Sequence, residues 1–152
     1  MNRRTAIAMS SAEIAAFLDE QRTLTVATLG RDGWPHVMPL WYVLREGECW
    51  AWTYAKSQKV RNLERDARCT VALEAGTSYL DLRGVMLKCA AAIHRDPEVV
   101  AGVGTQLARR YGAAGGHVSP EQAAKRVALQ FVVKEVASFD HRKLASSDVR
   151  PA

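Results

Sequence analysis

Cysteine and histidine are scarce in this sequence, and neither occurs at metal-ligand spacing. Three of the 152 residues are cysteines, and Cys49, Cys69 and Cys89 are widely spaced without a C-x-x-C pair. The four histidines lie at no ligand spacing to the cysteines or to one another. We therefore predict that the protein has no metal site. Because the number of cysteines is odd and each lies in a strand-like apolar run, we expect reduced thiols in the core.

The chain also lacks a long apolar run. A membrane-spanning helix needs about 18 consecutive apolar residues, and no segment reaches this length. The N-terminal stretch MNRRTAIAMS has two arginines before a short apolar segment, but it is too short for an export signal and has no cleavage pattern. We expect a cytoplasmic protein with no membrane partner.

Repeats and inter-domain linkers are absent as well. A single domain over 1–152 is expected, with flexible segments at 1–9 and 145–152. Lys and Arg number 21 against 16 Asp and Glu, and the net charge of +5 favours an anionic partner such as a phosphorylated cofactor. The basic residues form no stripe with interleaved aromatic residues, so we expect no nucleic-acid partner.

Runs of apolar and β-branched residues predict six strands, over 23–29, 34–44, 49–55, 68–75, 79–95 and 127–139. The turns GRDG and EGE join the first three strands as a meander. Capping signals predict helices that begin at Ser10, Ser57, Asp96 and Ser119. Pro35 and Pro39 are expected at a sheet edge, and Gly84 at a bend.

The order of these elements indicates the fold class. The hairpin links between the first strands favour antiparallel pairing, and no helices separate these strands as a parallel arrangement would require. A barrel is an economical way to pair this many antiparallel strands. The prediction is an α+β fold, mainly antiparallel, with a six-stranded split β-barrel and three to four peripheral helices.

The connector YAKSQKVRNLERD (54–66) combines a helix start with positive charge. Ser57 is the predicted N-cap, and such a helix start attracts anions through its first amides, which are those of Gln58, Lys59 and Val60. Lys59 and Arg61 oppose the helix dipole there. This local conflict indicates an anionic ligand. The alternative is a solvated basic turn whose charge is balanced by Glu64 and Asp66.

Over residues 10–140 the sequence resembles a known family. An opening helix, TLTVATLGRDGWPHVMPLWYV, WAWTYAKSQKVRNLERDARCTVAL, LRGVMLKCAAAI and a helix ending in RRYG follow one another as in the pyridoxamine 5'-phosphate oxidase-like split-barrel superfamily. Within it, the chain is most similar to the deazaflavin-dependent oxidoreductases. The resemblance implies a homodimer with sites between the subunits, and coenzyme F-420 as cofactor, with FMN as the alternative.

The resemblance also implies the cofactor-binding residues. These are His36, Met38, Pro39, Trp41, Thr53, Ser57, Gln58, Lys59, Val60 and Arg61. Many relatives have Ser-Arg-Lys in the connector, whereas this chain has Gln58 before the lysine and so lacks one guanidinium. Strand alternation sends His36 and Met38 to one face and Pro39 and Trp41 to the other, so contact with both sets requires a bulge. The alternative places Met38 and Trp41 in the core.

The activity implied by the resemblance is hydride transfer between reduced coenzyme F-420 and a small unsaturated or quinone-like substrate, with the catalytic residues unknown. An FMN-binding oxidase or flavin reductase is one alternative, and a cofactor carrier without turnover is another. Carboxylates of an oligoglutamate-bearing cofactor could meet the basic groups 109–111 and 141–143. The alternative for the first group is a solvated helix end that suits the helix dipole.

Overall fold

The structure, a computed structural model, describes residues 2–112 and 115–146. Helices alternate irregularly with strands along the chain. The elements are α1 (Arg3–Ile7), α2 (Ser11–Glu20), β1 (Thr23–Leu29), β2 (Pro35–Trp41), β3 (Val43–Arg45), β4 (Glu48–Tyr54), α3 (Gln58–Arg65), β5 (Arg68–Ala75), the 3-10 turn η1 (Tyr79–Asp81), β6 (Arg83–His94), α4 (Pro97–Tyr111), α5 (Pro120–Ala123), β7 (Arg126–Asp140) and α6 (Arg142–Ala145).

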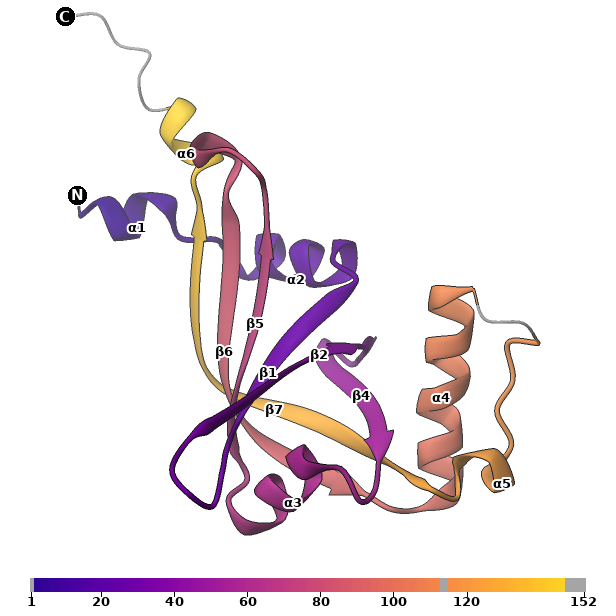
Figure 1. The fold of residues 1–152 in the computed structure, drawn as a ribbon. Coiled ribbons are helices and arrows are strands. Elements are labelled where there is room, and N and C mark those ends of the chain that lie inside the picture. The colour runs from indigo at the N-terminus through magenta and orange to yellow at the C-terminus, as the bar shows by residue number, and fades with distance from the viewer. Residues whose placement is uncertain (1, 113–114, 147–152) are drawn as a thin grey trace, which may run out of the picture.

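The strands form one curled antiparallel sheet in the order β2-β1-β5-β6-β7-β4-β3. Figure 1 shows β5, β6 and β7 running side by side at one end of the molecule, while α4 lies beside β4 at the other end. The predicted α+β class with mainly antiparallel pairing is therefore confirmed, and the curled sheet is a half-barrel of the kind that the predicted split β-barrel requires. The described residues contain seven strands instead of six, and six α-helices instead of three or four. Pro35 and Pro39 lie on the edge strand β2, as expected.

The extra strand arises at Tyr42, so the prediction of one strand over 34–44 is wrong. Tyr42 is fully buried, and its amide donates to the Tyr111 hydroxyl at 3.2 Å. The same hydroxyl lies 2.9 Å from the Tyr42 carbonyl oxygen. Because the backbone groups of Tyr42 bond to a side chain on α4, they leave the sheet ladder. The ladder is therefore interrupted between β2 and β3.

The strand predicted over 79–95 begins later, because its first residues form η1. The Asp81 carboxylate accepts hydrogen bonds from the amides of Thr77 and Ser78, which favours a tight turn. Gly84 lies within β6, and the irregularity expected there occurs instead as a register shift between Lys88 and Cys89.

The ends of the chain contain two of the additional helices. The segment 1–9, expected to be flexible, includes α1, and α6 begins just before the expected C-terminal tail. Residues 147–152 of that tail lie outside the described residues. Within the described ranges, no helix combines the length and the apolar character that a membrane crossing requires.

Apolar side chains pack on both sides of the curled sheet. Inside the curl, α2 and α3 add Phe17, Val60 and Leu63 to a core of inward-facing strand residues, which include Leu24, Val26, Val71, Leu129 and Phe131. Outside it, Val100, Val103 and Leu107 of α4 pack with Val43 and Ala128. The helix α4 therefore covers the outer side of β3, β4 and the first part of β7.

The cysteines are free thiols in the buried part of the sheet, as the sequence predicted. Burial raises the pKa of Cys49 and of Cys69 to about 12, and that of Cys89 to about 11. A thiol with such a raised pKa is protonated at neutral pH, so these residues act as small apolar core residues.

Close approach of α4 to β4 depends on a glycine. A Cβ atom on Gly104 would lie 2.5 Å from the Trp52 ring, whereas a Cβ atom on Gly102 would meet only the Arg45 guanidinium, at 3.9 Å. The two glycines share one helix and differ in what faces them. Alanine substitutions at these two positions therefore separate the effect of an added methyl group on packing from its effect on helix propensity.

We predict opposite effects for the two alanine substitutions on the free energy of unfolding. Gly102→Ala should raise it by about 0.5–1 kcal/mol, the usual gain in a helix interior. Gly104→Ala should lower it by about 1–3 kcal/mol, because the added methyl group overpacks against Trp52. Thermal or denaturant unfolding measures both, and equal shifts for the two variants would contradict the tight contact.

Candidate functional site

A gap between β2 and β4 marks the candidate site. Residues 51–54 of β4 pair with β7 on one side, and among the described residues no strand pairs with their other side. β2 is the opposite edge of the curled sheet. A cavity of about 480 Å³ opens here, and its lining comprises Thr23, Pro39, Leu40, Trp41, Trp52 and Leu107.

Helix α3 follows the unpaired stretch of β4 along the chain, with Ser57 at its N-cap, three residues after the end of the strand at Tyr54, as predicted. The Ser57 amide donates to the Tyr54 carbonyl, which fixes the turn from β4 into the helix. The Ser57 hydroxyl makes no capping bond, and its buried oxygen has no hydrogen-bond partner within the described chain. A buried hydroxyl without a partner costs free energy, so this atom is available to a ligand.

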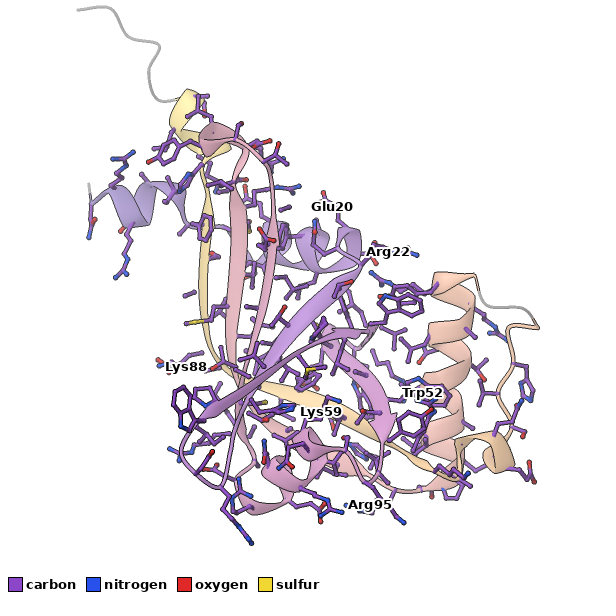
Figure 2. The ribbon with its side chains drawn as sticks, viewed as in Figure 1. Glu20, Arg22, Trp52, Lys59, Lys88 and Arg95 are labelled. Carbon is purple, nitrogen blue, oxygen red and sulfur yellow. The ribbon has the colours of Figure 1, made fainter. Side chains whose placement is uncertain are left out.

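Lys59 is buried, with 9% of its surface exposed, and Figure 2 shows it on α3 within the curve of the sheet. Its Nζ donates to the Thr53 hydroxyl oxygen at 3.0 Å. Burial lowers its pKa from the ordinary value of 10.5, because the ammonium loses contact with water. The structure thus brings together Thr53, Ser57 and Lys59 of the predicted cofactor-binding set.

The acidic residues of the connector do not balance this lysine. The Glu64 carboxylate lies 3.7 Å from Arg95, and that of Asp66 lies 2.8 Å from Arg68. No carboxylate in the described part of the chain lies within ion-pair distance of Lys59. The alternative of a solvated, internally balanced basic turn therefore fails for Lys59, although Arg61 is exposed.

A buried polar network attaches α3 to the sheet. Asn62 is fully buried and donates to the Thr28 hydroxyl at 3.0 Å. It accepts from the Gln58 side-chain amide at 2.8 Å, and Arg65 donates to the Leu29 carbonyl. The Gln58 side chain is thus bonded to its own helix. Sequence reasoning missed Asn62, although it follows Lys59 by three residues, a spacing that places both side chains on one face of α3.

The remaining connector residues differ in what they offer to a ligand. The Val60 side chain is fully buried in the core, so only its amide is placed to meet a ligand. Arg61 is exposed on the first turn of the helix, and its amide donates to the Ser57 carbonyl. The backbone amides of the first turn, including those of Gln58 and Lys59, have no acceptor within the helix.

The β2 residues of the predicted site divide between two faces. β1 and β2 pair without a register shift from Thr23 opposite Trp41 to Leu29 opposite Pro35, so the bulge that would bring both faces to a ligand is absent. Pro39 and Trp41 line the cavity. His36 and Met38 lie on the other face, opposite Thr28 and Val26.

The alternative that Met38 and Trp41 are core residues is wrong, because their exposed fractions are 43% and 58%. His36 is half-buried, and its buried Nδ1 atom has no hydrogen-bond partner in the described structure. Trp52, which sequence reasoning did not assign to the site, forms the β4 side of the cavity. Trp52 precedes Thr53 on the strand, and this adjacency is the signal that could have identified it.

The basic group 109–111 has a structural role through two of its members. Arg110 donates to the carbonyls of Asp19 and Gln21, which joins the end of α4 to the end of α2. The Tyr111 ring stacks on Trp41 with a centroid distance of 4.4 Å. The alternative of a simply solvated helix end does not hold for these two residues. Arg110 and Tyr111 are therefore part of the packing beside Trp41, which lines the cavity.

The second basic group lies far from the first, near the end of the molecule where α6 is seen in Figure 1. His141 bonds to the Tyr79 carbonyl, Arg142 pairs with Asp140 at 2.7 Å, and Lys143 pairs with Glu13 at 2.8 Å. Each of these groups is engaged with a local partner. The structure therefore does not join residues 141–143 to residues 109–111.

Comparison with known proteins places this geometry in a family. Residues 10–140 match the pyridoxamine 5'-phosphate oxidase family. A conserved hypothetical protein from Mycobacterium tuberculosis has a similar structure, with 40% identity, a TM-score of 0.86 and coverage of 100% of this chain and 95% of that one. No curated protein shows a significant sequence match.

Two more distant solved structures share the fold. An F420 reductase has 20% identity and a TM-score of 0.66, with 80% of this chain and 94% of that chain covered. An FAD-binding protein from Mesorhizobium loti has 16% identity and a TM-score of 0.69, with 86% and 94% covered. Given the family match over residues 10–140 and the 40% identical relative, the chain belongs to the pyridoxamine 5'-phosphate oxidase family.

Proposed function

We propose that this protein is a deazaflavin-dependent oxidoreductase that binds coenzyme F-420 through its phosphate at the start of α3. The observation that carries the proposal is the buried ammonium of Lys59, which has a hydroxyl partner but no carboxylate in the described chain. A buried charge is stable only when it is paired and hydrogen-bonded. A phosphate supplies both the opposite charge and the acceptors.

The groups at the start of α3 fit a phosphate because they offer hydrogen-bond donors. They are the unpartnered Ser57 hydroxyl, the Lys59 ammonium and the first-turn amides of α3. Thr53 orients Lys59 through its hydrogen bond. Arg61 adds an exposed positive charge on the same turn. This donor set is what an anion requires.

The cavity between β2 and β4 suits the ring of the coenzyme. Its volume of about 480 Å³ falls within the range of roughly 300–1000 Å³ for ligand cavities. Pro39, Trp41 and Trp52 give it apolar walls that exclude water from a bound ring. When bound, coenzyme F-420 supplies hydride transfer to or from a small unsaturated or quinone-like substrate. The protein then contributes binding and orientation.

The choice of coenzyme F-420 over FMN rests on Gln58 and on the comparisons. Gln58 stands where relatives with Ser-Arg-Lys have a guanidinium, and its side chain bonds to Asn62. The phosphate therefore meets one positive side chain fewer. The F420 reductase shares the fold, which supports the same cofactor here. The FAD-binding protein supports the second candidate, an FMN-binding oxidase or flavin reductase.

Binding measurements test the choice of cofactor. We expect wild-type protein to bind coenzyme F-420 more tightly than FMN, measured by fluorescence titration or calorimetry. Tight FMN binding without deazaflavin binding would favour the second candidate. Oxidation of the reduced coenzyme should then be followed with quinones and enones. Binding without turnover across such a panel would favour a carrier over an enzyme.

We predict that Lys59→Ala weakens coenzyme binding by roughly 1.5–3 kcal/mol, the range for a hydrogen bond to a charged group. Lys56→Ala is the matched control, because Lys56 is exposed three residues earlier and carries the same charge. It should change the affinity much less. Titration of the three proteins under one buffer condition measures the effect, and equal losses in both variants would point to general electrostatic attraction.

The affinity should also depend on pH through Lys59. The ammonium form binds the anion, and burial lowers the pKa of this lysine below 10.5. As the pH rises through that lowered pKa, the ammonium is lost and affinity falls. The titration of the coenzyme itself affects both proteins equally, so it cancels in the ratio of the wild-type and Lys59→Ala dissociation constants. A ratio that stays constant up to pH 10.5 would contradict the role of the lysine.

We further propose that the protein is a homodimer whose interface covers the outer face of β1, β5 and β6. The register places five exposed, uncharged residues in one row across this face, namely Pro39, Thr25, Ala72, Met86 and Ala137. The row lacks charged residues, and the centre of a protein interface is depleted of charged residues in the same way. Because Pro39 also lines the cavity, the proposed interface lies next to the site.

The dimer proposal predicts a change in molecular mass on substitution. Ala72→Glu places a charge at the centre of the row and should shift the protein from dimer to monomer, measured by light scattering after gel filtration. Ala124→Glu is the control, because Ala124 is exposed just after α5 and lies outside the row. A wild-type monomer, or dissociation by both variants, would refute this interface.

A further inference from the structure

Arg126, the first residue of β7, has an arrangement that the proposed phosphate contacts leave unexplained. Its guanidinium carbon lies 4.3 Å from the centre of the Trp52 ring and 4.2 Å from that of the Tyr54 ring. These are the shortest distances among the stacked arginines of the described chain. Two rings therefore hold this cation in place.

The guanidinium donors of Arg126 make no hydrogen bond or ion pair within the described residues, although its backbone pairs with Tyr54. By contrast, Arg22 stacks on a ring and donates to the Arg110 carbonyl, and Arg83 stacks on a ring and pairs with Glu20. Contact with aromatic rings occupies the two faces of a guanidinium, whereas its N–H donors lie at the edge and remain free to bind a ligand. Arg126 thus combines a fixed position with unused donors, which suits a planar anion.

The position of Arg126 relates it to the candidate site. On β4, Thr53 is buried on the inner face and bonds to Lys59, whereas Trp52 and Tyr54 point to the outer face and hold Arg126. The two cations therefore flank the same stretch of β4 from opposite faces. Figure 2 shows Trp52 beside α4, and this side chain also lines the cavity.

We propose that Arg126 forms a second anion-binding subsite, which takes a carboxylate on the outer face of β4, beside the Trp52 ring that lines the cavity between β2 and β4. The inference rests on the proposed function, since it assigns a second acidic group to the molecule bound there. That group belongs either to an acidic tail of the coenzyme or to the second substrate. In both cases the guanidinium accepts it in a bidentate geometry. Stacking on Trp52 and Tyr54 fixes the guanidinium before the ligand arrives.

The test compares four proteins, namely the wild type, Arg126→Gln, Arg126→Lys and the control Arg45→Gln. Arg45 also stacks on one tryptophan without a hydrogen bond in the described structure, but it lies on β3 beside a different cavity. The first probe is citrate, a tricarboxylate, titrated by calorimetry. The second is coenzyme F-420 with its oligoglutamate tail or with the glutamates removed. Thermal unfolding of each variant reports its folding.

We expect Arg126→Gln to bind citrate about tenfold more weakly than the wild type, the loss of one charge-assisted contact. Arg126→Lys should be intermediate, because it keeps the charge and loses the planar fork. Arg45→Gln should bind like the wild type. The proposal is overturned if wild type and Arg126→Gln bind citrate with equal affinity or if neither binds it. It is also overturned if Arg45→Gln loses as much citrate affinity as Arg126→Gln.

The titrations with the two forms of the coenzyme identify the molecule that supplies the carboxylate. If the tail is the ligand, Arg126→Gln should lose about tenfold affinity for the tailed coenzyme and none for the shortened form. If citrate binding depends on Arg126 while both coenzyme forms bind all four proteins alike, the carboxylate belongs to the second substrate. A wild type that binds neither coenzyme form refutes the proposed function, while the citrate arm still decides the role of Arg126.

Discussion

The closure of the sheet at Tyr42 determines the geometry on which the site depends. This residue is all that separates β2 from β3, which are the two outermost strands of the sheet, so its position forces the two edges together. Its hydroxyl donates to the end of α2, at the Leu18 or Gln21 carbonyl, while its backbone bonds to Tyr111 on α4. Among the residues that the structure describes, the two edges meet only at this point, and the gap between β2 and β4 remains beside it.

Local sequence patterns predict much of the fold but cannot reveal this closure. The strands at 23–29 and 68–75 match their predicted bounds, because β-branched alternation and flanking turns are local signals. Helix starts are likewise predicted by capping residues that lie within a few positions of the start itself. The same rules assign Tyr42 to a strand. The hydroxyl that removes it from the ladder belongs to Tyr111, which is distant in sequence.

The candidate site shows the same division between local and long-range information. The helix start at Ser57 and the positive charge beside it follow from the connector itself, where that charge conflicts with the helix dipole, whereas the burial of Lys59 is seen only in the structure. The contact between Lys59 and Thr53 is also close in sequence. By contrast, the partner of Asn62 lies on β1, and the rings that hold Arg126 lie on β4. Such contacts depend on strand order, which the alternation of residues does not encode.

The attachment of α3 through Asn62 has a consequence for the thermodynamics of binding. Asn62 and Arg65 fix the helix to β1 without any contribution from a ligand. A ligand therefore meets donors that are already oriented, and little conformational entropy is lost when it binds. Such preorganisation favours affinity through slow dissociation, because the donors cannot relax toward other partners. The unliganded protein bears the corresponding cost, since it must hold a desolvated ammonium next to an unsatisfied hydroxyl.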